Sequence, residues 1–320
     1  MEGRDRDMTA LLSTWHEVLA GHNRMIAVDG ESGVGKSRLV KTFLHQATSE
    51  TRSTVLRGRS YTLSPVRVFG LVIDLLRNAW RVGRAEDRHR FHRLPLQQLA
   101  LVREMLPELG ELGVLDSIGR MRQVDDRDEL FAAVSAFLLS AAGPPIDGRP
   151  NPLILFVDDA QWADPASLEF FNYILQTERE APLLLILTTR PEEVGPEQVN
   201  AVMALRKLPQ TRTWTVKRVD KASIERMVGS LIEPADQDEV SNFLTSRSKG
   251  LPLVITETIN YLCDFGHLKP GPDGRWQLET PLKQVARTVP LPVGELIERR
   301  MHKLPSSTRR LISHAALIGQ

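Results

Sequence analysis

Short runs of apolar residues alternate with longer stretches in which apolar residues recur at helical spacing. Leu153–Val157 and Leu183–Leu187 are apolar at every position, and Met25–Val28 is a shorter run of the same kind. Strands that are apolar on both faces are typical of a parallel sheet with helices on either side. The pattern therefore predicts an α/β fold up to about residue 220 and a mainly helical region beyond it.

The predicted elements alternate between strand and helix, which fits crossover connections between parallel strands. The predicted strands are 25–28, 54–59, 153–157 with the two acids at its end, 183–190 with polar residues at its end, and 213–219. The predicted helices among them are one within 3–21 after a short lead-in, one that follows residue 36, 66–82, irregular pieces within 94–125, 128–139, and one that starts at Asp164-Pro165. Beyond residue 220 the predicted helices are 223–231, 236–247, one that starts near 250, 291–303 and 306–318, with a turn at 269–276.

The first candidate for chemistry is Gly30-Glu-Ser-Gly-Val-Gly-Lys-Ser37, which has the spacing G-x-x-x-x-G-K-[ST] between a predicted strand and a predicted helix. A phosphate chain is wrapped closely by backbone N–H groups, and glycine provides the room and the positive φ that this requires. Lys36 is expected to reach the β- and γ-phosphates, and the Ser37 hydroxyl to bind Mg²⁺. The residues predicted to hold the nucleotide are Gly30, Ser32, Gly33, Val34, Gly35, Lys36, Ser37 and Arg38.

The second candidate is the pair of carboxylates Asp158 and Asp159, which ends a predicted buried strand. Ligands of open parallel sheets bind beyond the carboxyl ends of the strands, so both side chains are expected at the ligand edge. Asp158 is predicted to bind Mg²⁺, and Asp159 to orient or deprotonate an attacking water. Arg190 ends the next strand at the same edge, although it also fits an ordinary surface position. The candidate catalytic residues are Asp159, Lys36 and Arg190.

Length and composition describe an ordinary globular chain. With 320 residues, 42% hydrophobic and 25% charged, two or three domains are expected. The formal net charge of +1 gives no general attraction to nucleic acid or to a membrane surface. The single cysteine, Cys263, excludes an internal disulfide, and no stretch approaches the ~20 apolar residues that span a bilayer. The composition predicts a cytoplasmic protein, and the end at Gln320, soon after a predicted helix, a fragment of a longer one.

Two basic features have both a functional and an ordinary interpretation. Residues 77–93 contain six arginines and two acids, which fits either a phosphate- or nucleic-acid-binding patch or a solvated helix face. The scarcity of aromatic residues among them favours the solvated face. Arg4, just before the first predicted helix, fits an exposed arginine when it is taken alone.

Taken together, these residues resemble the module of STAND-type, AAA-related P-loop ATPases in large LuxR-type transcriptional regulators and beside class III adenylyl cyclases. The matching pieces are Gly3-Arg4-Asp5, Gly30–Ser37, Asp158-Asp-Ala-Gln-Trp-Ala-Asp164, Thr188-Thr-Arg190 and Gly250-Leu-Pro252. The resemblance implies a parallel five-stranded sheet of order 5-1-4-3-2, a helical lid, and the start of a winged-helix-like domain. The implied boundaries are 1–220 for the ATPase core, 221–287 for the lid and 288–320 for the truncated third domain.

The same resemblance assigns roles to further residues and names ligands. It implies that Arg4 lies on the adenine side, that Pro252 packs against adenine, and that Arg190 acts as a sensor. Many related ATPases have glutamate at the position of Asp159, but aspartate fits this branch and suits slow hydrolysis. ATP or ADP with Mg²⁺ is the implied ligand, with an unidentified inducer or partner protein and a nucleotide-dependent homo-oligomer. DNA contact is expected only through domains outside the chain.

The predicted function is a regulatory, slowly hydrolysing Mg-ATPase module of a signalling or transcriptional regulator. The alternative is a non-hydrolysing interaction module or scaffold that holds ADP as a structural ligand. A DNA-binding regulator in its own right is disfavoured by the near-neutral charge. A small-molecule kinase is disfavoured because the paired carboxylates end a middle strand and a helical region follows the sheet.

Overall fold

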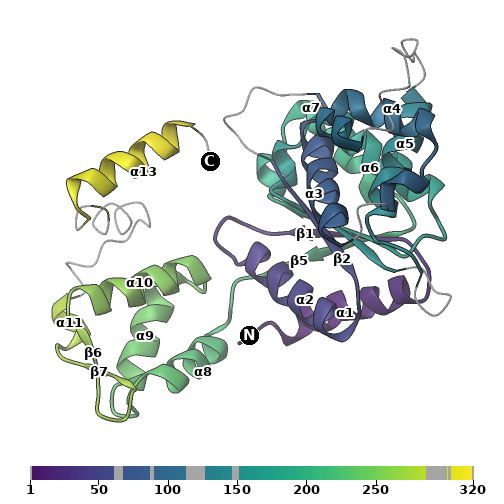
Figure 1. Ribbon diagram of the computed structural model, residues 1–320. Coiled ribbons are helices and arrows are strands. Elements are labelled where there is room, and N and C mark those ends of the chain that lie inside the picture. The colour runs from purple at the N-terminus through teal and green to yellow at the C-terminus, as the bar shows by residue number, and fades with distance from the viewer. Residues whose placement is uncertain are drawn as a thin grey trace. The chain divides into compact units, whose positions relative to one another are not determined.

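The computed structural model describes residues 2–60, 68–86, 90–112, 127–145, 151–285, 301 and 304–318. The chain divides into two compact units (Figure 1). The sheet unit comprises Thr9–Asp29 and Ser37–Thr215, and the helical unit comprises Met1–Met8, Gly30–Lys36 and Val216–Gln320. Within the described ranges, no helix is both long and apolar enough to cross a membrane.

Five parallel strands form the sheet in the order β2-β3-β4-β1-β5. The strands are β1 (Arg24–Asp29), β2 (Thr54–Arg59), β3 (Leu153–Asp158), β4 (Leu183–Thr189) and β5 (Thr211–Thr215). Counted from the other edge this is the order 5-1-4-3-2, so the predicted P-loop fold is confirmed. In this order the carboxyl ends of β1, β3 and β4 lie next to one another, because β4 pairs with both of its neighbours.

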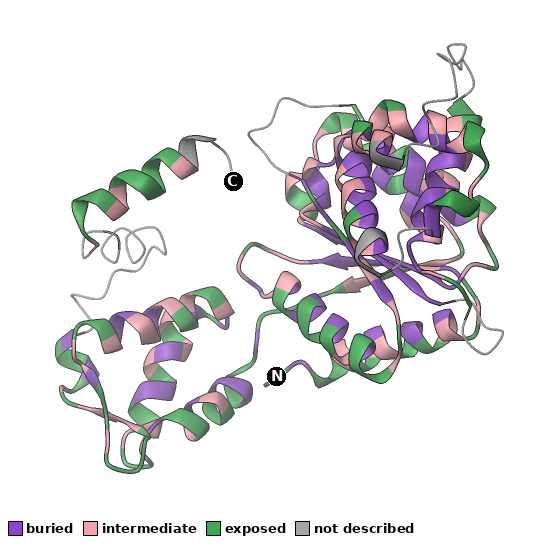
Figure 2. Ribbon diagram, in the orientation of Figure 1, coloured by how far each residue is buried: buried purple, intermediate pink, exposed green. Residues whose placement is uncertain are grey.

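Alternate residues of the central strands face two layers of helices. Met25 and Ala27 of β1 belong to a core shared with one layer, whereas Ile26 and Val28 are buried on the opposite face. Figure 1 places α1 and α2 on one face and α3 to α7 on the other, and Figure 2 shows the strands buried between them. These helices are α1 (Asp5–Leu19), α2 (Lys36–Glu50), α3 (Gly70–Glu86), α4 (Leu96–Met105), α5 (Arg127–Ser140), α6 (Pro165–Thr177) and α7 (Pro196–Arg206).

Short 3₁₀ turns complete the sheet unit, and two of them follow the carboxyl ends of β3 and β4. They are η1 (Arg90–Arg93), η2 (Pro107–Leu112), η3 (Ala160–Trp162) and η4 (Pro191–Glu193). The turn η3 follows β3 directly, and Asp159 between them has φ 57° and ψ 48°, a left-handed conformation. Because the backbone changes from extended at Asp158 to left-handed at Asp159, the two side chains point in different directions.

The helical unit packs its own small core. Val240, Leu244 and Leu262 are among its fully buried residues. Its elements are α8 (Lys221–Leu231), α9 (Gln237–Ser248), α10 (Pro252–Asp264), β6 (Leu268–Pro270), β7 (Trp276–Leu278), α11 (Leu282–Val285) and α13 (Ser306–Ile318). The predicted turn at 269–276 is flanked by the antiparallel strands β6 and β7, which the sequence analysis missed because each has only three residues. The predicted helix 291–303 lies almost wholly outside the described residues.

Two predicted boundaries in the sheet unit are wrong. The last strand ends at Thr215 rather than at residue 219, because its partner β1 ends at Asp29, which pairs with Thr215. The helix predicted from residue 66 begins at Gly70, and Phe69 has φ 59°, which a helix does not admit. The pattern of apolar residues extends beyond both true ends, so periodicity alone placed them incorrectly.

The predicted start of α6 at Asp164-Pro165 is confirmed. The Asp164 carboxylate accepts hydrogen bonds from the Ser167 backbone N–H at 2.9 Å, from the Ser167 hydroxyl at 2.6 Å and from the Phe69 backbone N–H at 2.9 Å. Asp164→Ala is expected to lower the free energy of unfolding by about 2 kcal/mol, because it removes a helix cap and leaves buried donors without an acceptor. Urea denaturation measures this; an unchanged midpoint would contradict the assigned cap, and Asp164→Asn should recover most of the loss.

Candidate functional site

The phosphate loop, residues 30–36, depends on glycine at three positions. Gly30, Gly33 and Gly35 have φ of 153°, 77° and 98°. A Cβ on Gly30 would lie 2.9 Å from the Val216 carbonyl oxygen, and one on Gly33 would lie 2.8 Å from Cβ of Leu253. A Cβ on Gly35 would meet nothing within 4 Å, so at that position only the backbone conformation demands glycine.

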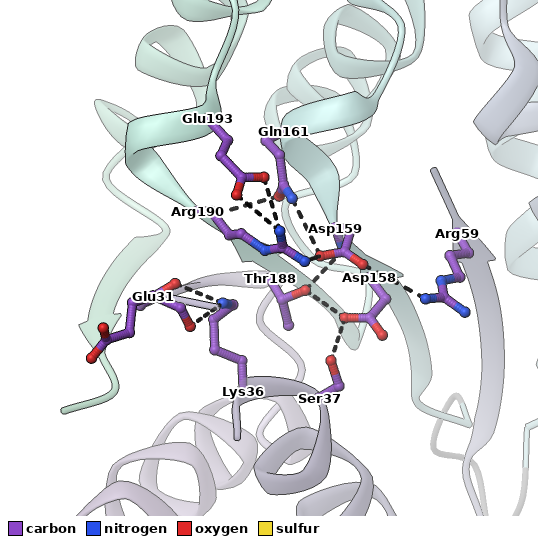
Figure 3. Close-up of polar contacts among 11 residues, drawn as sticks. Glu31, Lys36, Ser37, Arg59, Asp158, Asp159, Gln161, Thr188, Arg190 and Glu193 are labelled. Atoms are coloured by element: carbon purple, nitrogen blue, oxygen red, sulfur yellow. Dashed lines mark hydrogen bonds and ion pairs between the residues drawn. The ribbon is translucent and has the colours of Figure 1, made fainter. Parts of the chain in front are cut away.

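Lys36 folds back over this loop. Its Nζ donates to the carbonyl oxygens of Gly30 at 2.6 Å and of Glu31 at 3.1 Å, and the residue is only 6% exposed (Figure 3). Lys36 and Ser37 are also the first two residues of α2, where backbone N–H groups lack helical partners. The loop thus combines a buried ammonium group with a helix N-terminus, two features that favour an anion.

Arg4 is buried, so the exposed position predicted from its local sequence is wrong. Its guanidinium donates to the carbonyl oxygens of Val34 and of Lys217, each at 2.7 Å, and to the Asp7 carboxylate at 3.1 Å. The side chain is therefore a clamp between the phosphate loop and the segment that follows β5. Its guanidinium holds two backbone segments in place.

The phosphate loop makes two further contacts within the helical unit. The Leu253 N–H, in the first turn of α10, donates to the Gly33 carbonyl oxygen at 3.1 Å. Arg218 donates to both carboxylate oxygens of Glu31, through Nη2 at 2.6 Å. The hydrogen bond from Arg218 lowers the pKa of Glu31, and the charges of Arg218 and Lys36 act in the same direction against desolvation. These contacts tie the loop to the linker after β5 and to α10.

Replacing Arg218 with Gln is expected to return the pKa of Glu31 toward its ordinary value. A carboxylate with a lowered folded-state pKa adds stability that is present above its unfolded pKa, about 4.3, and is lost as the pH falls through the folded value. Wild type should therefore exceed Arg218→Gln in unfolding free energy at pH 7, by less than about 1 kcal/mol because both side chains are largely exposed. The difference should shrink as the pH falls below the unfolded pKa of about 4.3; a difference that did not depend on pH would contradict the pairing.

The acidic end of β3 forms a hydrogen-bonded cluster with Ser37 and β4. Oδ1 of Asp158 accepts from the Ser37 hydroxyl at 2.8 Å and from the Thr188 hydroxyl at 2.6 Å (Figure 3). The Thr188 oxygen in turn accepts from the Asp159 backbone N–H at 2.9 Å. The carboxylate and the hydroxyl predicted to bind Mg²⁺ are thus brought into direct contact.

Asp159 lies in a second cluster that contains Arg190. Its Oδ1 accepts from Nε2 of Gln161 at 3.2 Å and from Nη2 of Arg190 at 3.4 Å, and its Oδ2 lies 3.9 Å from Nη2 of Arg59 (Figure 3). Gln161 is fully buried, and its Oε1 accepts from the Arg190 backbone N–H at 3.3 Å. Two arginines therefore face this carboxylate, Arg190 on one oxygen and Arg59 on the other.

Arg190 is held between two carboxylates. Its Nη1 donates to both oxygens of Glu193, at 2.9 and 3.0 Å, while its Nη2 reaches Asp159. Desolvation acts to lower the pKa of Arg190, but the Glu193 hydrogen bond and the charge of Asp159 outweigh it, and the pKa is raised. The arginine is therefore a fixed positive charge that follows the carboxyl end of β4, and only a quarter of its side chain is exposed.

The carboxyl end of β1 carries a partly buried ion pair that the sequence analysis did not identify. Asp29, 5% exposed, accepts from Nη2 of Arg206 at 2.7 Å and from the Thr189 hydroxyl. Thr188 and Thr189, consecutive in β4, thus bind the acidic ends of the two neighbouring strands. Arg206 balances a buried negative charge immediately before the phosphate loop, where a phosphate would otherwise be repelled.

The chemistry of these donors fits a nucleotide with a divalent cation. A serine hydroxyl and a carboxylate are hard oxygen ligands of the kind that Mg²⁺ takes together with phosphate oxygens and water. The open space beside Gly35 leaves the loop backbone accessible, and Lys36 supplies a positive charge. Ser37 and Asp158 therefore offer oxygen ligands suited to Mg²⁺, and the loop offers backbone N–H groups and an ammonium group suited to a phosphate chain.

Comparison with known families agrees with this chemistry. A family model described as AAA ATPase domain matches residues 2–186, more than half of the chain. The chain belongs to the AAA ATPase domain family. The matched part of this AAA domain contains the phosphate loop and both carboxylates of β3, and membership implies a nucleotide ligand, usually with Mg²⁺.

The curated relatives of the AAA domain are much longer than this chain. An uncharacterized protein of Rhizobium meliloti is 26% identical over 196 residues, which cover 59% of this chain and 18% of the relative. The hybrid signal transduction histidine kinase G of Dictyostelium discoideum is 22% identical over 179 residues, which cover 54% of this chain and 5% of the relative. The chain thus spans less than a fifth of the length of either relative.

Solved structures similar to the AAA domain are distant. Cdc6p from Pyrobaculum aerophilum matches with a TM-score of 0.47 and 13% identity, covering 82% of this chain and 62% of that one. Drosophila ORC bound to DNA matches with a TM-score of 0.41 and 15% identity, covering 82% of this chain and 56% of that one. Similarities this distant do not bear on what the AAA domain binds.

The remaining predicted residues of the AAA domain lie as follows. Ser32 of the loop and Arg38 of α2 are exposed, whereas Val34 is buried and supplies the carbonyl that Arg4 binds. Pro252 is half-buried as the first residue of α10. Apart from Arg4, each predicted site residue lies in the loop, in the first turn of α2, at the sheet edge or at the start of α10. Arg4 lies just before α1 and donates to the carbonyl oxygens of Val34 and Lys217.

The sequence analysis missed several side chains that hold these groups. Gln161 follows the paired carboxylates by two positions, and Thr188 is a polar residue at the end of an apolar run, so both had a local signal. Arg206 and Arg218 had none, because each binds a carboxylate more than 170 residues earlier in the chain. Only the assembled fold brings these arginines to the AAA domain's ligand edge and to its phosphate loop.

Proposed function

We propose that the chain is the ATP-binding regulatory module of a signalling or transcriptional regulator, with slow Mg-ATP hydrolysis as its conformational switch. The observation that carries this proposal is the contact of Asp158 with both Ser37 and Thr188 through one carboxylate oxygen. A carboxylate at a strand end and a hydroxyl one residue after the loop lysine hold Mg²⁺ in P-loop ATPases. The family match to the AAA ATPase domain supports the same conclusion.

The residues of the chain would share the work as follows. Bound Mg²⁺ would neutralise charge on the β- and γ-phosphates. Ser37 and Asp158 would hold the ion, and the Lys36 ammonium would exchange the carbonyls of Gly30 and Glu31 for phosphate oxygens. The N–H groups of the loop would surround the phosphates, and Arg190 would lie at the sheet edge as a fixed positive charge.

Asp159 is proposed to orient the attacking water. Because Gln161 and Arg190 already donate to one of its oxygens, the carboxylate is held in one direction. A carboxylate oxygen that already accepts two hydrogen bonds has less capacity to accept one from a water, which makes slow turnover the expected behaviour. A slow rate suits a switch, because the bound nucleotide then persists long enough to define a state.

The helical unit is proposed to sense the state of the phosphate loop as a lid. Support comes from three contacts on the loop: Arg4 on Val34, Arg218 on Glu31, and Leu253 on Gly33. A loop that rearranges around phosphates would change each of them, and the linker after β5 with it. An inducer or partner protein and a nucleotide-dependent homo-oligomer belong to this proposal as the readout of the switch.

A second function is favoured by one observation, the engagement of the Asp159 carboxylate by Gln161 and Arg190. If that arrangement prevents water activation altogether, the chain is an interaction module in which ADP is structural. Turnover of Asp159→Asn separates the two functions.

Asp159→Asn is expected to lower ATP turnover at least about tenfold while ATP affinity changes less than about threefold, since general-base and orienting groups contribute to rate more than to binding. The measurement is phosphate release under single-turnover conditions with ATP affinity determined in parallel. Asp238→Asn, an exposed carboxylate in α9, is the control and should match wild type. Equal turnover in wild type and Asp159→Asn, with nucleotide bound in both, would favour the structural-ADP function.

A further inference from the structure

A hollow of about 490 Å³ lies in the sheet unit beside the acidic end of β3. We call it the basic groove, and it is lined by Lys41, Arg57, Gly58, Arg59, Asp74, Arg77, Asn78, Arg81, Phe156 and Asp158. These residues come from α2, β2, α3 and β3. Two of them, Arg77 and Arg81, belong to the arginine-rich segment, which the sequence alone favoured as a solvated helix face.

The pairing of β2 with β3 explains why its arginines gather on one side. Arg57 pairs with Phe156, and Arg59 pairs with Asp158, in a parallel register that places paired residues on the same face of the sheet. Gly58 between the two arginines points the other way, where its Cβ would lie 2.6 Å from a Leu71 side-chain carbon. The edge strand therefore presents two arginines next to the carboxylate that holds Ser37.

The helix α3 closes the outer side of the groove. Asn78 Oδ1 accepts from the Arg57 backbone N–H at 2.9 Å, so the helix is fixed along the free edge of β2. Arg77 is balanced by Asp74 at 3.7 Å and by Glu108 at 3.2 Å. Among the described residues, the side chains of Lys41 and Arg57 make no hydrogen bond or ion pair, and the lining carries five positive and two negative side chains.

The size and lining of the groove select a class of ligand. Its volume falls within the range of small-molecule sites, about 300–1,000 Å³. A guanidinium group binds phosphate through two parallel, charge-assisted hydrogen bonds. Several arginines around one hollow therefore suit a ligand with several phosphates. Phe156 is only 3% exposed, so the lining offers no aromatic face on which a nucleic-acid base could stack. The chain's net charge of +1 likewise gives no general attraction to a nucleic acid.

We infer that the basic groove binds a small molecule carrying two or more phosphate groups, at a site separate from the phosphate loop. Its lining includes Asp158, whose carboxylate also holds Ser37. An occupant would therefore add negative charge beside the proposed Mg²⁺ ligands. The inference rests on the groove itself and does not require that the chain hydrolyse ATP.

The test uses fructose 1,6-bisphosphate as a probe, because it carries two phosphates and no base. Titration calorimetry on the full chain, saturated with ADP and Mg²⁺, should show one saturable site. The double variant Arg57→Gln/Arg81→Gln should lower the affinity for the probe at least about tenfold, as expected for the loss of charge-assisted hydrogen bonds. Arg52→Gln/Arg93→Gln removes the same charge from two exposed arginines outside the groove and should leave the affinity unchanged.

A second measurement keeps this test independent of the phosphate loop. Lys36→Ala, without ADP, should still bind the probe with wild-type affinity, whether or not the phosphate loop binds nucleotide. The inference is overturned if the probe shows no saturable binding at millimolar concentration. It is also overturned if the two double arginine variants lower the affinity for the probe equally. A single-stranded oligonucleotide that binds where the bisphosphate does not would overturn it in favour of a nucleic-acid site.

Discussion

Lys36→Ala is expected to abolish tight nucleotide binding, with a loss of affinity of more than about 100-fold for ATP. The Lys36 ammonium is buried and is the positive side-chain charge of the loop, where it donates to the carbonyls of Gly30 and Glu31. Removing a charge-assisted contact to phosphate lowers the binding free energy by about 3 kcal/mol. Since about 1.4 kcal/mol corresponds to a tenfold change in Kd, the loss in affinity exceeds about 100-fold. The loss should be larger for ATP than for ADP, because the lysine reaches the γ-phosphate as well as the β-phosphate.

The control for this variant is Lys207→Ala, an exposed lysine at the end of α7. It removes the same charge from the sheet unit and should bind ATP and ADP like wild type. Circular dichroism of Lys36→Ala should match that of wild type, which separates lost binding from lost folding. Unchanged affinity in a folded Lys36→Ala would contradict the role assigned to the loop.

The second large effect is expected for Asp158→Asn. Asparagine retains an oxygen that can accept from Ser37 and Thr188, so the hydrogen bonds of the strand end survive while the negative charge is lost. Mg²⁺ should then no longer raise the affinity for ATP, and turnover should fall at least about 100-fold, which corresponds to about 2.7 kcal/mol of transition-state stabilisation. The free energy of unfolding should change by less than about 1 kcal/mol.

ATP affinity measured with Mg²⁺ and with excess chelator gives the decisive comparison for Asp158. Wild type and the control Asp238→Asn should bind more tightly with Mg²⁺, and Asp158→Asn should bind equally under both conditions. If Mg²⁺ strengthened binding in Asp158→Asn as much as in wild type, Asp158 would not be a ligand of the ion.

Most elements of the sheet unit could be predicted from the sequence, because local patterns encode them. The apolar runs of β3 and β4 are buried at every position. The helix α6 starts at Asp164-Pro165 as predicted. The motif spacing also placed the loop and Asp158 correctly at the carboxyl ends of strands. The order of the strands came from the resemblance to P-loop ATPases, since periodicity does not specify which strands pair.

The contacts between distant segments could not be predicted, because no local pattern records them. The local sequence predicted an exposed Arg4, yet the side chain is buried and donates to carbonyl oxygens of two separate segments. Arg206 and Asp29 form an ion pair across 177 residues, and α7, which carries Arg206, has too weak an apolar stripe to stand out in the sequence. The groove between α2, β2 and α3 likewise exists only after the edge strand has paired with β3.

The most direct test of the proposed Mg-nucleotide site is an equilibrium titration of nucleotide-stripped protein with fluorescent ATP and ADP, with and without Mg²⁺. Any nucleotide released on denaturation should first be identified, since trapped ADP would itself reveal an occupied loop. We predict saturable binding at one site, strengthened by Mg²⁺ and absent in Lys36→Ala. Folded, stripped wild-type protein that binds neither nucleotide would contradict the account.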